Sequence, residues 1–323
     1  MANLFSNNYE IELNKLFQTH LLDSEWSKKR RIAVVSNHLQ SLDIALLLLK
    51  NNFSVMVHSA VIYPTSVIEK FESSGGEYID AVLSSKSLEK VYAKSAFVFY
   101  DDAECFTEFK NKNYPRAFSI GDFNNLEQAL KNFLSQIKIC AKISEKLSKC
   151  ETVVFGGSFN PITVAHFEII GYLANMLLKK VEILPNGSSY KLKTLSNNSS
   201  RIDSLKEIAD LFPSVSLNLI ELHKDFNGTY ETLRELRHPY FVIGADSLKD
   251  IPTWIEPELL INENNFIVFN RHNLNCRRII NNTTLLSKYS DHFIIIDDFD
   301  LDVSSSKYKE TKDKNLLPIN YSK

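Results

Sequence analysis

Short β-branched and aromatic segments alternate with segments of helical character along most of this chain. Residues 31–36, 96–100 and 240–243 are rich in Val, Ile, Phe and Tyr, which is typical of buried strands. Segments such as 39–51 and 201–211 lie between such runs and have helical character. Strands that alternate with helices of this length predict an α/β fold, built on parallel sheets with helices on their faces.

The same pattern predicts the other elements and divides the chain in two. Further strands are expected at 53–58, 81–83, 152–155, 180–184, 215–219, 265–269 and 292–296, and further helices at 67–73, 87–93, 126–147, 161–178 and 230–236. The helix at 126–147 has apolar residues three or four positions apart on one face, and we interpret it as the connection between two units. We expect a smaller α/β domain over 1–148 and a second α/β domain over 149–323.

The composition is that of a globular protein and favours no membrane or nucleic-acid partner. Of the 323 residues, 44% are hydrophobic and 24% are charged, which excludes a disordered chain or a fibre. The longest apolar run, Ile44–Leu49, has six residues, whereas a membrane span needs ~20. A net charge of −2 provides no attraction to nucleic acid or to an anionic membrane.

The cysteines and the N-terminal residues indicate a reducing compartment. Cys105, Cys140, Cys150 and Cys276 form no Cys-x-x-Cys pair and have no histidine at zinc-finger spacing, so we interpret them as free thiols. The N-terminal residues carry early acids and no apolar core, unlike a secretory signal. We expect a cytoplasmic protein, and the sequence leaves a homo-oligomer open.

The segment that carries the chemistry begins with a strand and ends at His166. The strand leads into Gly156 and Gly157, whose missing side chains let a ligand approach the backbone, and Pro161 suits the first turn of a helix. Thr163 and His166 are three positions apart, so they share one face of that turn. Unpaired N–H groups and the positive end of the helix dipole would lie there too, which favours a polyphosphate ligand.

Each of these residues also has a plain structural explanation. A Gly-Gly pair between a strand and a helix can be a tight turn only, and a single histidine is more often a satisfied surface or core residue than a ligand-binding group. The order of the whole segment favours the functional interpretation. It is neither the phosphate-binding loop that ends in Gly-Lys-Ser/Thr nor the dinucleotide motif Gly-x-Gly-x-x-Gly.

The segment Gly156–His166 resembles the opening motif of nucleotidyltransferases with a (His/Thr)-x-x-His signature. It is most similar to that of the nicotinate or nicotinamide mononucleotide adenylyltransferases. Further segments resemble the family in order: Pro185–Lys191, Arg201, Gly228–Leu236, Phe241–Leu248 with Trp254, Phe266–Arg271 and Val303–Lys309. The resemblance covers residues 150–320 or so and implies a Rossmann-like nucleotidyltransferase domain with a parallel sheet.

The resemblance implies a transferase of NAD biosynthesis. The phosphate of nicotinate mononucleotide, or of nicotinamide mononucleotide, would attack the α-phosphorus of ATP, and pyrophosphate would leave. The nucleophile belongs to the substrate, so catalysis rests on positioning and charge neutralisation. Mg²⁺ is expected with ATP, held by phosphates and water without direct protein ligands.

The resemblance also assigns roles to individual residues. The expected catalytic residues are His166, Thr163 and Lys309, where Thr163 bonds a nearby phosphate and Lys309 replaces the arginine that closes the family pattern. The expected ATP-binding residues are Gly156, Gly157, Ser158, Phe159, His166, Gly244, Asp246, Arg271, Ser304, Ser305 and Ser306. The expected mononucleotide-binding residues are Gly157, Ser158, Phe159, Lys191, Tyr230, Thr232 and Trp254.

Several alternatives remain open at this point. Trp254 could be a core residue, Asp246 could cap a helix that begins near Ser247, and Arg271 could be a surface cation. The enzyme could instead adenylylate another small phosphate such as phosphopantetheine, or the chain could be a non-catalytic nucleotide sensor.

The first domain carries no comparable motif. Its first expected strand-to-helix turn, Ser36-Asn37-His38, has no glycine, which argues against a phosphate-binding turn. Asp101-Asp102 follows an expected strand, where α/β sites often lie, but acids there are also ordinary turn residues. We interpret residues 1–148 as a non-catalytic or regulatory domain or a dimerisation module, with a second enzyme of the same pathway left open.

Overall fold

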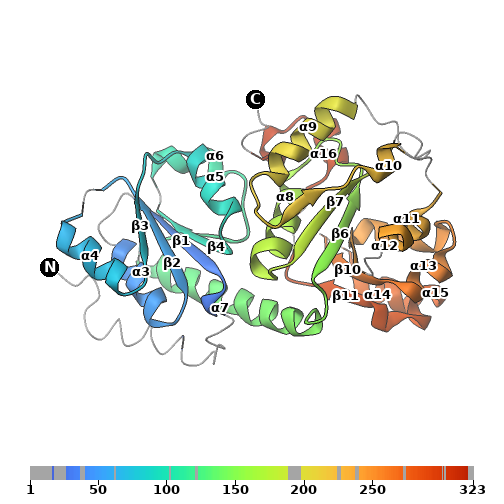
Figure 1. Ribbon diagram of the computed structural model, residues 1–323, viewed down its shortest axis with the longest axis horizontal. Helices are drawn as coiled ribbons and strands as arrows, with labels where there is room; N and C mark the ends of the chain where they lie inside the picture. The colour runs from blue at the N-terminus through green and yellow to red at the C-terminus, as the bar shows by residue number, and fades with distance from the viewer. Residues whose placement is uncertain are drawn as a thin grey trace. The chain divides into compact units, whose positions relative to one another are not determined.

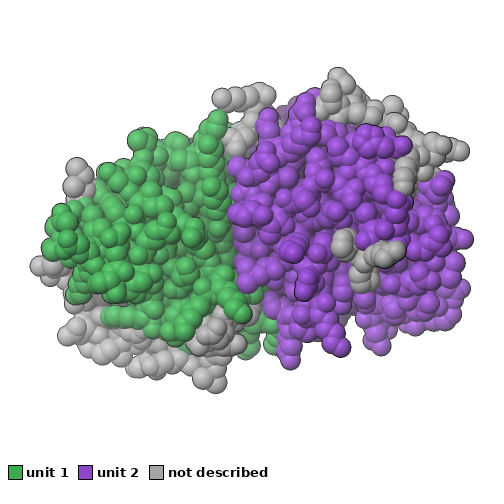
Figure 2. All heavy atoms as spheres, viewed as in Figure 1, with its two compact units in different colours: residues 1–142, 323 green, residues 143–322 purple. Residues whose placement is uncertain are grey.

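The computed structural model divides the chain into two compact units, residues 1–142 with Lys323 and residues 143–322 (Figure 2). The residues that it describes are 17, 27–36, 41–61, 63–101, 103–120, 123–187, 198–223, 227–236, 240–271, 274–299, 301 and 303–318. Among them, no helix is both long enough and apolar enough to cross a membrane.

The first unit is a parallel sheet of five strands in the order β3-β2-β1-β4-β5 (Figure 1). Its strands are β1 (Arg31–Ser36), β2 (Ser54–Ser59), β3 (Glu77–Asp80), β4 (Phe97–Tyr100) and β5 (Ala117–Ser119). Its helices are α3 (Ser41–Lys50), α4 (Thr65–Ser73), α5 (Ser85–Ala93), α6 (Thr107–Lys110) and α7 (Phe123–Lys146). Phe133 of α7 packs against Phe97, Phe99 and Phe118 of two neighbouring strands.

The second unit is a parallel sheet of six strands in the order β11-β10-β9-β6-β7-β8. Its strands are β6 (Thr152–Gly157), β7 (Lys180–Pro185), β8 (Val215–Leu217), β9 (Tyr240–Gly244), β10 (Asn265–Phe269) and β11 (Phe293–Ile296). Its helices are α8 (Val164–Gly171), α9 (Asn198–Ala209), α10 (Ile220–His223), α11 (Thr229–Leu236), α12 (Ala245–Asp250), α13 (Pro257–Glu263), α14 (Cys276–Asn282), α15 (Thr284–Lys288) and α16 (Ser305–Thr311).

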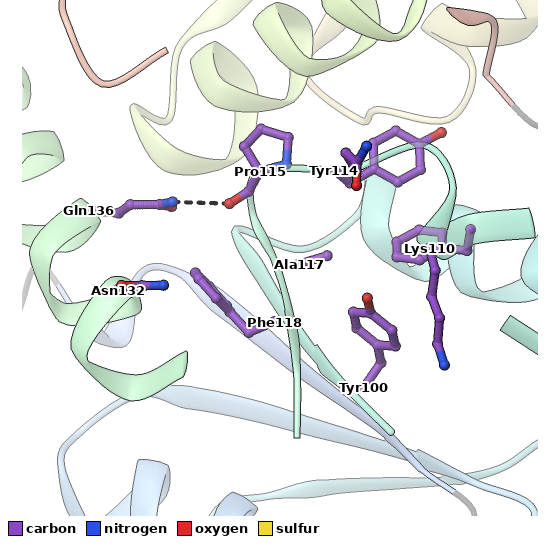
Figure 3. Close-up of a pocket in the computed structure, with 10 residues that line it drawn as sticks. Tyr100, Lys110, Tyr114, Pro115, Ala117, Phe118, Asn132 and Gln136 are labelled. Atoms are coloured by element: carbon purple, nitrogen blue, oxygen red, sulfur yellow. Dashed lines mark hydrogen bonds between the residues drawn. The ribbon is translucent and has the colours of Figure 1, made fainter. Parts of the chain in front are cut away.

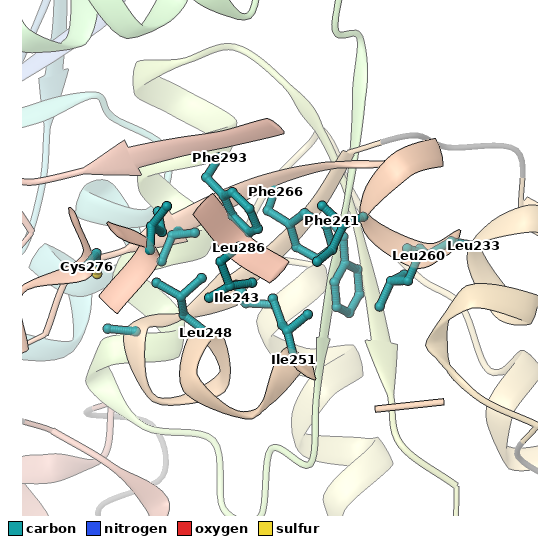
Figure 4. Packing of buried hydrophobic residues seen from close by; sticks show 14 of the residues in the cluster. Leu233, Phe241, Ile243, Leu248, Ile251, Leu260, Phe266, Cys276, Leu286 and Phe293 are labelled. Carbon is teal, nitrogen blue, oxygen red and sulfur yellow. The ribbon is translucent and has the colours of Figure 1, made fainter. Parts of the chain in front are cut away.

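Helices cover both faces of the second sheet. On one face, Phe241, Ile243 and Phe266 from the strands pack with Leu248 of α12 and Leu286 of α15 in a buried cluster (Figure 4). On the other face, the π-helical turn that follows α8 contributes Tyr172, which lies edge-on against Phe269 of β10. This arrangement confirms the α/β fold with parallel sheets that the alternation of strands and helices predicts.

The strand order places the loops after β6 and β9 next to each other at the carboxyl ends of the strands in the second sheet. The chain builds β6, β7 and β8 outward in one direction and then returns to β9 on the other side of β6. The carboxyl ends of β6 and β9 therefore flank the point where the order reverses, which is where open α/β sheets bind ligands. Gly157 and Gly244 are the last residues of these two strands.

Two strands of the first unit differ from the prediction. The strand expected at 81–83 lies instead at β3, Glu77–Asp80, and the sequence does not predict β5. Both are short edge strands, and β3 has an acid at each end, so neither shows a clear apolar pattern. The division between the units falls inside α7, the helix interpreted as the connection.

Candidate active site

The turn after β6 is tightly packed by aromatic rings. A Cβ atom at Gly156 would lie 2.5 Å from the Phe241 ring, and one at Gly157 would lie 3.2 Å from the Phe159 ring. The rings of Phe241 and Phe159 therefore occupy the space where side chains at these two positions would lie. Packing against Phe241 is enough by itself to require a glycine at position 156. Ser158, the next residue, is partly exposed.

Phe159 supports the turn with its side chain and leaves its backbone beside the motif. The residue has a φ of 45°, a left-handed conformation that a bulky side chain rarely adopts. Its ring is 1% exposed and lies 5.1 Å from the His166 ring, centroid to centroid. The whole residue is buried, so its role in the turn is packing against His166.

Thr163 holds the His166 ring at the start of α8. The Thr163 N–H donates to Nδ1 of His166 at 3.0 Å, and the Thr163 hydroxyl lies 2.8 Å from the same nitrogen. Because Nδ1 accepts from the backbone, the neutral ring carries its proton on Nε2. The His166 side chain is partly exposed, whereas Thr163 is fully buried.

This geometry corrects two expectations. Pro161 does not open the helix: the Asn160–Pro161 peptide is cis, and α8 begins at Val164 after an extended Thr163. Thr163 is therefore the N-cap residue, and its hydroxyl faces His166. Thr163 acts on the histidine, and no part of its side chain is exposed for a phosphate.

Arg201, whose role the sequence analysis left open, joins two of the loops at this edge. Its Nη1 donates to the Ser158 carbonyl at 2.8 Å and its Nη2 to the Asn186 carbonyl at 2.9 Å. The side chain is 5% exposed, and burial lowers the pKa of the guanidinium. One buried cation thus fixes the backbone after β6 against the backbone after β7.

The last helix reaches the same turn. The Ser305 hydroxyl donates to the Pro161 carbonyl at 2.7 Å. Ser304 is the N-cap of α16, and its hydroxyl accepts from the Lys307 N–H at 3.0 Å. Ser306 and Lys309 are exposed on this helix. The expected phosphate-binding segment therefore meets the motif turn, with two of its hydroxyls engaged by the backbone.

Two expected ATP-binding residues form an ion pair beyond β9 and β10. Arg271 donates from Nη1 to the Asp246 carboxylate. Asp246 lies within α12, which begins at Ala245, so the alternative of Asp246 as the cap is wrong: Gly244 holds that position. A Cβ atom at Gly244 would meet no described atom within 4 Å, so this glycine, unlike Gly156, leaves open space.

The Trp254 loop packs on the Gly228 turn. Trp254 is partly buried against the core cluster, in part as the core alternative predicts. A Cβ atom at Gly228 would lie 3.0 Å from Cβ of Ile255, and Gly228 has a φ of 111° that only glycine adopts readily. The structure therefore brings Ile255, the residue after Trp254, against the turn that precedes the Tyr230 helix.

Carboxylates hold the side chains of Tyr230 and Thr232. The Tyr230 hydroxyl donates to Glu263 Oε1 at 3.1 Å, and the Thr232 hydroxyl donates to Glu221 Oε1 at 3.1 Å. Glu221 is 6% exposed, and burial raises the pKa of its carboxyl to about 7. Glu221 lies between Ile220 and Leu222 and belongs to none of the motifs, so the sequence gives no signal for it. Lys191 lies outside the described residues.

The second unit is similar in sequence to known proteins. Residues 154–311 match the cytidylyltransferase-like family. A probable nicotinate-nucleotide adenylyltransferase of Acholeplasma laidlawii is 33% identical over 174 residues, which cover 52% of this chain and 89% of that protein. This chain belongs to the nicotinate-nucleotide adenylyltransferase family. A second family member, from Fusobacterium nucleatum, is 35% identical over 128 residues, 36% of this chain and 66% of that protein.

Solved structures give further similarities. Two structures of Plasmodium falciparum nicotinic acid mononucleotide adenylyltransferase, one complexed with APC and one with NaAD, are 23% and 24% identical in sequence to the chain described here. They have TM-scores of 0.42 and 0.43, and each comparison covers 53% of this chain and 87% of the solved chain.

Proposed function

We propose that this chain transfers the adenylyl group of ATP to nicotinate mononucleotide or nicotinamide mononucleotide. The observation that carries the proposal is the His166 ring, held by Thr163 at the first turn of α8 and beside the carboxyl ends of the strands. Membership of the family, whose named relatives are nicotinate-nucleotide adenylyltransferases, supports the same reaction.

The reaction needs no covalent enzyme intermediate. A phosphate oxygen of the mononucleotide forms a bond to the α-phosphorus of ATP, and the bond from that phosphorus to the bridging oxygen of pyrophosphate breaks. Nε2 of His166 carries a proton and would donate a hydrogen bond to an oxygen of the reacting phosphates. Removal of such a donor typically costs about 10²–10³ in rate.

Other residues would bind the two substrates. The open space beside Gly244 suits the adenosine of ATP. Asp246 and Arg271, which form an ion pair, follow the ends of β9 and β10 in the chain. The exposed Lys309 would neutralise the terminal phosphates. Trp254, beside the Gly228 turn, would stack on the pyridine ring.

Mg²⁺ would enter with ATP. Among the described residues, no group of three or more His, Cys, Asp or Glu side chains is arranged to hold a metal ion. The cation would be held by the phosphates of ATP and by water, with Asp246 accepting a hydrogen bond from a bound water. Such an ion supplies charge neutralisation of the leaving pyrophosphate.

Product analysis tests the proposal. Purified protein with ATP, Mg²⁺ and each mononucleotide in turn should release pyrophosphate and form the matching dinucleotide, and His166→Ala should lower the rate at least a hundredfold. His292→Asn is the matched control. His292 precedes β11 and bonds the carbonyl of Asn264, which precedes β10, so both lie at the amino ends of the parallel strands, away from the turn after β6. ATP binding with no turnover for either substrate would contradict the proposal and indicate a nucleotide sensor.

A further inference from the structure

The aromatic residues that line a cavity in the first unit pack on one another. Tyr100, Phe109 and Tyr114 lie beside β5 (Figure 3), with ring centroids 5.5 and 4.7 Å apart, and each is at most 9% exposed. These rings therefore serve the packing of the first unit. In the second unit, a buried carboxyl group that takes no part in the chemistry described above connects loops of the candidate active site.

This carboxyl belongs to Glu221, whose backbone lies against the loop after β7. Glu221 is part of α10, which follows β8, and it is 6% exposed. A Cβ atom at Gly187 would overlap the Glu221 carbonyl oxygen, so only a glycine lets the loop pass so close to α10. The preceding residue of that loop, Asn186, donates its N–H to the Gly157 carbonyl at 2.9 Å. The loop after β7 is thus held between α10 and the turn after β6.

The side chain of Glu221 reaches a further segment, the start of α11. The Thr232 hydroxyl oxygen lies 3.1 Å from Glu221 Oε1 and 3.3 Å from the Gly228 carbonyl oxygen. A hydroxyl has one hydrogen, so it can donate to only one of these two acceptors when the carboxyl is ionised. A protonated Glu221 donates to the hydroxyl oxygen, and the hydroxyl then donates to Gly228. The protonated form therefore makes both contacts hydrogen bonds.

The surroundings of Glu221 favour this protonated form. Burial raises the pKa of the carboxyl to about 7, and no cation in the described part of the chain contributes to the change. Arg234 of α11 pairs with Glu231 at 3.0 Å. His223 of α10 is exposed, and Glu182 of β7 accepts from an asparagine. The Glu221 carboxyl thus gains more from a proton than from a charged neighbour.

The Gly228 turn extends this support to the Trp254 segment. A Cβ atom at Gly228 would lie 3.0 Å from Cβ of Ile255, the residue after Trp254. The turn that Thr232 holds is therefore the turn on which this segment packs. Contacts run without a break from the loop after β7, through Glu221 and Thr232, to the Trp254 segment.

We propose that Glu221 is a positioning residue of the mononucleotide site, which holds the loop after β7, the start of α11 and the Trp254 segment in one arrangement. This role rests on the proposed function, in which Trp254 stacks on the pyridine ring. The carboxyl acts through Thr232. Its effect should be confined to the mononucleotide, because Gly244 and Arg271, expected at ATP, belong to β9 and the segment after β10, on the other side of β6.

Steady-state kinetics of the full chain test this role. Glu221→Ala and Thr232→Val each remove one partner, so each should raise the KM for the mononucleotide about tenfold, the effect of one lost hydrogen bond. The kcat and the KM for ATP should stay near the wild-type values. The double variant should resemble either single variant, because both changes break the same path. Glu221→Gln keeps an uncharged donor for the Thr232 oxygen and should recover most of the lost affinity.

Thr283→Val is the matched control. The Thr283 hydroxyl bonds the Ile279 carbonyl, four positions earlier, at 2.8 Å, as Thr232 does with Gly228, and it lies between α14 and α15. Its KM for both substrates should equal that of the wild type, and thermal unfolding identifies the folded variants. If Glu221→Ala does not fold, Thr232→Val and Glu221→Gln decide. Additive effects in the double variant, an equal rise in the KM for ATP, or a glutamine variant as weak as the valine or alanine variant would overturn the role.

Tryptophan fluorescence separates this role from the proposed function. In a Trp26→Phe background, Trp254 is the only tryptophan, and acrylamide quenching without substrate measures how firmly its segment is held. Quenching should increase in Glu221→Ala and Thr232→Val and stay constant in Thr283→Val. A wild type that turns over no mononucleotide would refute the proposed function, and the quenching would still decide the role of Glu221. Equal quenching in all variants would overturn it.

Discussion

Thr163 contacts one nitrogen of the His166 ring twice, through its backbone N–H at 3.0 Å and its hydroxyl at 2.8 Å. The pair lies at the first turn of α8, so one residue caps the helix and orients the imidazole. Both contacts are made to Nδ1, which directs Nε2 away from Thr163. The (His/Thr)-x-x-His spacing therefore places the Thr163 hydroxyl against the histidine ring.

The first prediction concerns this pair. Thr163→Val keeps the shape and the backbone contact but removes the hydroxyl, and the loss of one hydrogen bond of about 1–1.5 kcal/mol should lower kcat roughly tenfold. Thr163→Ser should restore most of the rate. Thr163→Val should lower kcat without raising the KM for either substrate, because the hydroxyl contacts only the histidine. A kcat equal to that of the wild type would show that the hydroxyl has only a structural role.

Two glycines should respond differently to the same substitution. Gly156→Ala forces a Cβ to 2.5 Å from the Phe241 ring, so the free energy of unfolding should fall by about 1–3 kcal/mol. Gly244→Ala enters open space, so stability should hold while the KM for ATP rises. Denaturant unfolding and steady-state kinetics separate the two effects. Equal KM values for Gly244→Ala and the wild type would remove Gly244 from the ATP site.

Arg201 should matter for substrate binding because it joins the loops after β6 and β7. Arg201→Lys cannot bond the Ser158 and Asn186 carbonyls together, so the KM for the mononucleotide should rise about tenfold, with a smaller change in kcat. Lys206→Met, on the exposed face of the same helix, is the control. If both variants have the same KM, the two loops keep their positions without the guanidinium.

Glu221 predicts a pH dependence of stability. Its carboxyl pKa rises from 4.5 to about 7 on burial, so the folded state holds this proton more tightly than the unfolded state. The stability that the group contributes is complete below pH 4.5 and is lost as pH rises to 7, by about 3 kcal/mol at most. Relative to Glu221→Gln, the wild type should therefore lose stability over this interval. Parallel stability curves for the two proteins between pH 4.5 and 7 would contradict the burial argument.

Patterns of neighbouring residues predicted much of this fold. The long β-branched runs at β1, β4, β6, β9 and β10 are all strands, because their composition suits only a doubly covered sheet. The short edge strand Ala117–Ser119 has no such run and forms only because β4 offers a partner. Pairing with β4 determines this strand, and the residues of the strand itself do not predict it.

The candidate active site, too, could be predicted from the sequence only where its residues are close together in the chain. The order of the motifs located the turn after β6, but the Arg201 bridge joins residues 43 and 15 positions away. The resemblance predicts Asp246 and Arg271 each beside ATP, and only the structure shows that they pair with each other. Spacing along one helix is readable from sequence, whereas the meeting of distant loops is not.

The hydrogen bond from Ser305 to the Pro161 carbonyl spans 144 positions of the chain. Helix α16 thus supports a turn that follows the first strand of the same unit. Removal of α16 would leave every strand of the sheet in place and still withdraw this support. Loss of function is therefore expected from changes at Ser305 as well as at the histidine motif.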